Sequence, residues 1–138
     1  MRIMAIDYGD AHTGIAISDP TGFLAGFTTV INAYRPEAAA DQIAALAAEH
    51  GVEELVLGHP INMDGTRGPR SEKAHAMKAL LEERVSLPVV LWDERRTTID
   101  AHQILFNSGK NAKKRKKVVD AVAASLILEG YLTFKKSH

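Results

Sequence analysis

The sequence predicts an α/β fold in which a five-stranded mixed sheet carries helices on both faces. Short apolar segments without a helical stripe, typical of buried strands, alternate with amphipathic segments after residue 35. Short links between the first three apolar segments favour an antiparallel meander. Strands that alternate with helices after such a meander predict one mixed sheet covered on both sides.

The five strands are predicted from apolar runs that end at turn residues. Gly9 follows the first run, and the turn Asp19-Pro20-Thr21-Gly22 closes the second. The predicted strands cover residues 2–8, 14–19, 23–31, 54–58 and 88–92.

Four helices are predicted from apolar residues spaced three and four apart. Proline followed by an acidic residue starts the first two, a threonine and an aspartate at capping-box spacing start the third, and glycine ends the first and third. The predicted helices cover residues 36–50, 69–84, 97–108 and about 116–134. In the last helix, the residues expected to face the core are Val119, Val122, Ala123, Leu126 and Ile127.

Length and composition indicate one globular domain over residues 1–138, because 46% of the residues are hydrophobic and 25% are charged. The absence of cysteine excludes a disulfide framework and a thiolate metal site. The N-terminus does not resemble a signal peptide, and no apolar run has the length of a membrane span. We therefore expect a cytoplasmic protein with no membrane partner; the sequence leaves its oligomeric state open.

The zero net charge conceals a strong asymmetry along the chain. Residues 1–94 carry 7 Lys/Arg against 14 Asp/Glu, whereas residues 95–138 carry 10 against 3. Most of the positive excess lies in residues 110–117, where six of eight residues are basic. Such asymmetry favours a polyanionic partner.

Acidic residues in three apolar settings are the candidate catalytic groups. Asp7 ends the first predicted strand, Asp93 and Glu94 follow the fifth, and Asp120 lies near the start of the last helix. A buried carboxylate costs several kcal/mol unless it is paired or binds a metal. Carboxylates that converge at the carboxyl ends of strands suit Mg²⁺ or Mn²⁺. Salt bridges or helix capping remain the alternative for each acid, and capping of the first turn would explain Asp120.

Two such cations would activate a water and stabilise the leaving oxygen in phosphodiester cleavage, with no Ser, Cys or His nucleophile. Only one residue of the acidic pair can face Asp7, unless the strand has already ended, because successive strand residues face opposite ways. We predict that Glu94 is the metal ligand and that Asp93 pairs with Arg95 or caps the next helix.

The basic run before Asp120 is the main candidate nucleic-acid contact. Lys113, Lys114 and Lys116 could follow a phosphate backbone, although a charged run is often only a solvated surface. Five successive basic residues cannot all face one way on a helix. We therefore expect part of residues 113–117 to be a loop, with the helix starting near Arg115.

Three arginines extend this candidate surface. Arg67 and Arg70 lie in the segment after the fourth strand and could contact phosphates at the N-terminus of the next helix, unless the segment is a plain connection. Arg95 flanks the acidic pair and could bind phosphate or pair with Asp93.

Taken in order, these motifs resemble the YqgF/RuvX family of RNase H-like nucleases over nearly the whole chain. The matching blocks are Ile6-Asp7-Tyr8-Gly9, Gly14-Ile15-Ala16-Ile17-Ser18-Asp19, Gly58 with Pro60 through Gly65, Gly68-Pro69-Arg70, Leu91-Trp92-Asp93-Glu94-Arg95, Thr97-Thr98, Lys114 through Asp120, and Ala123-Ala124 to Leu128 with Gly130-Tyr131-Leu132. Asp7, Glu94 and Asp120 fall on the family's acidic positions. The chain departs from the family at His59 and Arg96, where leucine is usual.

The resemblance implies an RNase H-like fold and a nuclease that matures the 5′ end of the pre-16S rRNA in ribosome biogenesis. It favours an rRNA precursor over DNA as partner, in contact with a ribosome or pre-ribosome. Two alternatives stay open: Holliday junction resolution, by analogy of fold to RuvC, and an RNase H-like module that binds nucleic acid without cutting it. An ATPase-like phosphate loop is disfavoured, because 138 residues provide no second phosphate loop.

Overall fold

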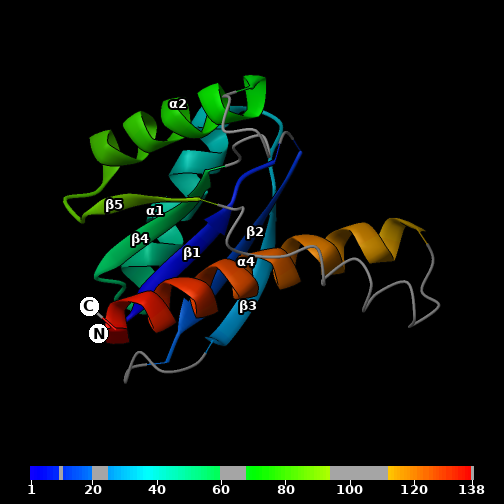
Figure 1. The fold of residues 1–138 in the computed structure, drawn as a ribbon. Helices are drawn as coiled ribbons and strands as arrows, with labels where there is room; N and C mark the ends of the chain where they lie inside the picture. Colours follow the sequence, from blue (N-terminus) through cyan, green and yellow to red (C-terminus); the bar gives the residue numbers. More distant parts are fainter. Residues whose placement is uncertain (10, 20–24, 60–67, 94–111, 138) are drawn as a thin grey trace.

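The computed structural model describes residues 1–9, 11–19, 25–59, 68–93 and 112–137. Their strands form one five-stranded mixed sheet (Figure 1). The strands follow the order β3-β2-β1-β4-β5. The pairs β1–β2 and β2–β3 are antiparallel, and the pairs β1–β4 and β4–β5 are parallel. The prediction of a mixed sheet is therefore confirmed. The strands are β1 (Ile3–Asp7), β2 (His12–Ser18), β3 (Ala25–Asn32), β4 (Glu54–His59) and β5 (Val89–Asp93).

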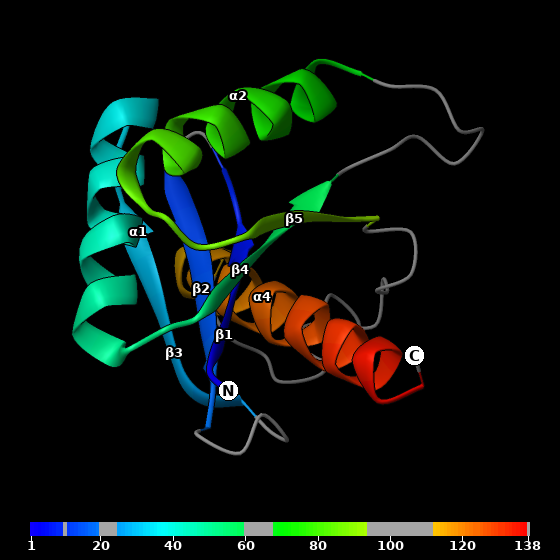
Figure 2. The same ribbon diagram turned by 90° about the vertical axis from the view of Figure 1, so that its left-hand side faces the viewer.

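Helices cover both faces of this sheet, as predicted. The helices α1 (Pro36–His50) and α2 (Pro69–Arg84) lie on one face, and α4 (Ala112–Ser137) crosses the other (Figure 2). The helix predicted over residues 97–108 lies outside the described residues. None of the helices in the described part of the chain is long and apolar enough to span a membrane.

The two sides of the sheet bury separate cores because strand residues alternate between faces. In β1, Met4 and Ile6 pack against α1 and α2, whereas Ile3 and Ala5 pack against α4. All four side chains are buried, which makes β1 the central strand of both cores.

The last helix differs from the prediction in both its start and its buried face. It begins at Ala112 rather than near residue 116. Of the residues expected to face the core, Ile127 is buried, but Ala123 and Leu126 are only half-buried. The aromatic contacts of Trp92 with Tyr131 and Phe134, each with ring centroids 5.6 Å apart, place the helix against the sheet. The fully buried face is Ala124, Ile127, Leu128, Tyr131 and Leu132.

A buried carboxylate attaches the end of α4 to the first residue of β4. Glu54 is 7% exposed, and its carboxylate oxygens accept hydrogen bonds from Lys135 Nζ at 3.2 and 3.3 Å. Burial and then the neighbouring Glu54 carboxylate raise the pKa of the Tyr131 phenol above its usual value of 10.0. This polar group lies at the amino end of β4, at the opposite edge of the sheet from Asp7.

Candidate active site

Asp7 occupies the position that the sequence predicted, at the carboxyl end of the central strand. It is the last residue of β1 and is half-buried. Because Ile3 and Ala5 pack against α4, the alternation of the strand directs Asp7 to the α4 face. The carboxyl ends of parallel strands in open α/β sheets are where ligands bind.

A glycine lies beside Asp7 on each neighbouring strand. Gly14 of β2 is its direct partner in the antiparallel pair. On the other side, Gly58 of β4 follows Leu57, the parallel partner of Ile6. Since paired residues share a face, the positions that pair with Asp7 on the two flanking strands carry no side chain.

Asp93 reaches the same edge of the sheet but the opposite face. It ends β5 and pairs with His59 of β4. Val89 and Leu91 pack into the core beneath α1 and α2, so Asp93, two residues further on, belongs to that face as well. The alternation therefore separates Asp93 from Asp7. Glu94 itself lies outside the described residues.

Asp120 lies within α4, well beyond its first turn. That first turn, which starts at Ala112, holds no acidic residue. The alternative that Asp120 caps the first turn is therefore wrong, because the helix begins earlier than the sequence indicated. The side chain of Asp120 is outside the described part of the structure.

The predicted nucleic-acid contacts are placed only through their backbone. Arg67 and Arg95 lie outside the described residues, and Arg70 lies in the first turn of α2. The three lysines, Lys113, Lys114 and Lys116, lie in α4. The expectation that part of this run is a loop is wrong, because α4 is already helical from Ala112. Within the described ranges, no three His, Asp or Glu side chains are grouped to hold a metal.

A buried polar group that sequence reasoning missed lies at the end of β4. The strand extends to His59, one residue beyond its predicted end, and this histidine is only 6% exposed. His59 Nε2 lies 2.6 Å from Ser71 Oγ, and its ring meets the His75 ring edge-on with centroids 4.7 Å apart. The alternation of Leu55, Leu57 and His59 was the available signal. The contacts attach β4 to α2 immediately beside the strand that carries Asp7.

A cavity of about 340 Å³ opens on the α1 and α2 side of the sheet, and sequence reasoning did not find it either. Tyr8, the residue after Asp7, forms one wall and packs against the core beneath the two helices. Among the described residues, its lining is Tyr8, Tyr34, Pro36, Lys73, Ala76 and Met77. No single sequence motif contains all of these residues, because they come from three separate segments.

Gly9 determines how the chain turns after Asp7. A Cβ at this position would clash with the carbonyl oxygen of His12. Any side chain would therefore displace the backbone between β1 and β2. The side chain of His12 in turn contacts the neighbouring strand, because its Nδ1 lies 2.6 Å from Oδ1 of Asn32, its pairing partner in β3.

This sheet, with three antiparallel strands followed by two parallel ones and an acid ending the central strand, defines the RNase H-like class of folds. The fold is similar to that of Thermus thermophilus RuvC in complex with a Holliday junction substrate, with a TM-score of 0.64 and 14% identity over 98% of this chain and 96% of that one. It is also similar to the Fowlpox virus resolvase in complex with Holliday junction DNA, with a TM-score of 0.61 and 11% identity over 98% and 99%.

The chain belongs to the RuvX family, described as Holliday junction resolvase, whose model matches residues 1–134. It is 44% identical over 135 residues to a protein of Halothermothrix orenii named "Putative pre-16S rRNA nuclease", covering 98% of this chain and 96% of that protein. The resemblance to the YqgF/RuvX family is therefore confirmed, and the chain is a member of a family of nucleases that act on nucleic acid.

Proposed function

We propose that residues 1–138 form a single metal-dependent nuclease domain that hydrolyses phosphodiester bonds by a two-metal mechanism. The observation that carries this proposal is the position of Asp7, which ends the central strand between Gly14 and Gly58. A half-buried carboxylate at a strand end, flanked by two glycines, fits a hard cation, which prefers oxygen ligands. When bound, Mg²⁺ or Mn²⁺ would supply an activated water and stabilise the leaving oxygen.

Asp7, Glu94 and Asp120 are the residues that would hold the metal. The alternation of β5 supports Glu94, because continuing it by one residue past Asp93 would put that position on the face of Asp7. Helical spacing supports Asp120, because it lies four residues before Ala124, which is buried against the sheet. These carboxylates would keep the negative charge of the site on one face, between the sheet and α4.

We further propose that the substrate is the 5′ end of pre-16S rRNA and that the protein acts in the cytoplasm during ribosome biogenesis. The name of the Halothermothrix orenii relative supports the rRNA precursor. In this proposal Lys113, Lys114 and Lys116 contact phosphates from α4, and Arg67, Arg70 and Arg95 contact them at the loops beside the site. The description of the family supports a second candidate substrate, a four-way DNA junction.

The test is cleavage by the purified protein of three labelled substrates: a pre-16S rRNA 5′ leader, single-stranded DNA and a four-way junction. Each is incubated with Mg²⁺, with Mn²⁺ and with EDTA. We expect metal-dependent cleavage of the leader and none by Asp7→Asn, which removes a charge but almost no volume. Preferred cleavage of the junction would indicate that the protein resolves four-way DNA junctions instead. Metal-independent binding without cleavage would indicate a binding module instead.

A further inference from the structure

The cavity beside Tyr8 combines aromatic walls with a lysine among its described lining residues. Tyr8 and Tyr34 supply the rings, Lys73 supplies the ammonium group, and Met77 is buried in the core beneath. Its volume of about 340 Å³ is that of a site for a small ligand or one unit of a larger one. Its walls thus match a ligand that has both a flat apolar face and a negative charge.

Tyr34 is the most exposed large hydrophobic residue of the described chain, with 84% of its surface accessible to solvent. Folding therefore gains little from this ring. A rigid aromatic side chain held in solvent beside a cavity is suited to stacking, and nucleic-acid bases stack on such rings regardless of sequence.

Lys73 provides the charge that would select an anion. The segment from residue 1 to residue 94 is strongly acidic, with 14 Asp/Glu against 7 Lys/Arg. A lysine ammonium in the wall of a cavity attracts a negative group by its charge. A base on the rings together with a phosphate at Lys73 describes one nucleotide.

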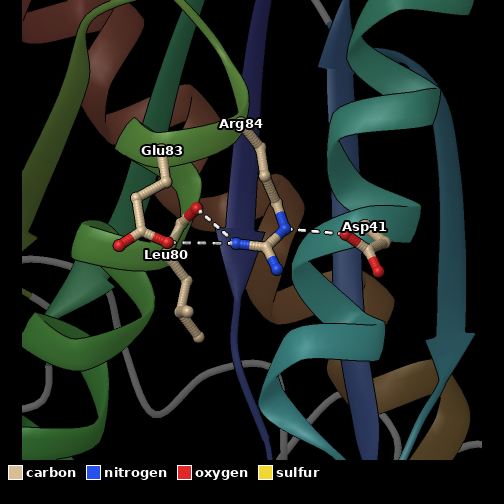
Figure 3. A network of polar contacts seen from close by, with 4 residues as sticks. All are labelled: Asp41, Leu80, Glu83 and Arg84. Carbon is tan, nitrogen blue, oxygen red and sulfur yellow. Dashed lines mark hydrogen bonds and ion pairs between the residues drawn. The ribbon is translucent and has the colours of Figure 1, made fainter.

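The two helices that form the cavity are held together by Arg84 (Figure 3). Its Nε donates to Asp41 Oδ1 of α1 at 2.7 Å, and its Nη1 donates to the carbonyl oxygen of Leu80 in α2 at 3.0 Å. Glu83 adds an ion pair at 3.6 Å. Of these contacts, the one with Asp41 joins α1 to α2, and the other two lie within α2 and orient the Arg84 guanidinium.

We propose that this cavity binds one unpaired nucleotide of the nucleic-acid substrate, with its base against Tyr34 and its phosphate at Lys73. The inference rests on the proposed nuclease function. Tyr8 directly follows Asp7 and lies on the other face of the same sheet edge, so a strand crossing that edge reaches both sites. A base within a duplex is stacked and paired and cannot enter. The cavity therefore selects substrates with an unpaired segment close to the cleavage site.

The test measures binding without cleavage, by fluorescence anisotropy of labelled single-stranded RNA and of a duplex of equal length in EDTA. Tyr34→Ala should weaken single-strand binding about fivefold or more, with little effect on the duplex, and Tyr34→Phe should bind like the wild type. Lys73→Ala should lower the salt slope of single-strand binding by about 0.7. Lys78→Ala is the matched control, because it removes the same charge from the same helix at a residue outside the described cavity lining.

The outcomes separate this inference from the proposed function. If wild-type protein cleaves RNA with Mg²⁺ while Tyr34→Ala and Lys73→Ala bind single strands like the wild type, the cavity proposal alone fails. If wild-type protein neither binds nor cleaves any substrate, both fail. A thermal shift with adenosine monophosphate that requires Tyr34, without an effect of Tyr34→Ala on strand binding, would assign the cavity to free nucleotides and overturn the proposal. Unchanged melting of Tyr34→Ala verifies its folding.

Discussion

Asp7 and Asp93 end two parallel strands at one edge of the sheet, but they lie on opposite faces. Asp7 continues the row of Ile3 and Ala5 beneath α4, whereas Asp93 continues the row of Val89 and Leu91 beneath α1 and α2. The strand β4 lies between β1 and β5. A one-residue slip of either outer strand would bring both acids to one face, but it would also move the buried apolar residues of that strand to the wrong face.

The first prediction follows from this separation. Glu94→Gln should abolish metal-dependent cleavage, because it removes the charge of a proposed metal ligand. Asp93→Asn should retain most activity, because its carboxylate belongs to the other face. Cleavage rates measured at saturating Mg²⁺, with melting temperatures as the check on folding, test the pair. An active Glu94→Gln together with an inactive Asp93→Asn would reverse the assignment.

The second prediction concerns the turn after Asp7. Gly9→Ala should lower the free energy of unfolding by roughly 1–3 kcal/mol and reduce cleavage, because its Cβ would displace the His12 carbonyl. Gly26→Ala is the control, since its Cβ would meet Asp19 atoms only at ordinary contact distances of 3.5 Å or more. Urea unfolding of both variants makes the comparison. Equal stability of the two would show that the turn relaxes freely.

The third prediction concerns the basic residues of α4. Replacing Lys113, Lys114 and Lys116 by alanine should weaken nucleic-acid binding most at low salt, by a similar factor for every sequence. Each lost phosphate contact should reduce the salt slope by about 0.7–0.9. Because residues three apart share a helix face, we expect the pair Lys113 and Lys116 to account for more of the loss than Lys114. An unchanged affinity and slope would make this run a solvated surface.

The fourth prediction concerns pH. The pKa of Tyr131 is raised in the folded protein, so above pH 10.0 the folded state binds the phenolic proton more tightly than the unfolded state does. Its contribution to stability is therefore complete below pH 10.0 and is lost as the pH rises beyond it. Tyr131→Phe should show a smaller decline in unfolding free energy over that range. Tyr34→Phe, at an 84% exposed side chain, is the control and should decline like the wild type.

Much of the fold could be predicted because its signals are local. Buried strands need unbroken apolar runs and helices need apolar residues three and four apart, so the order and approximate bounds of the described elements follow from neighbouring residues. The position of Asp7 at a strand end follows in the same way. The helical state of the basic run could also have been predicted, since alanine, lysine and arginine have high helix propensity. The loop was predicted instead because five successive basic residues cannot all contact phosphate from one face of a helix.

What the sequence by itself determined is therefore the alternation of β1, the acid at its end and the glycine that turns the chain after it. Only the tertiary structure decided which faces Asp7 and Asp93 belong to, the rotation of α4 onto Ala124 and Leu128, and the contact of His59 with Ser71. It also decided the cavity that brings Tyr8, Tyr34 and Lys73 together. These features depend on how separate elements pack, and packing is set by the shapes of side chains distant in sequence, which local periodicity does not encode.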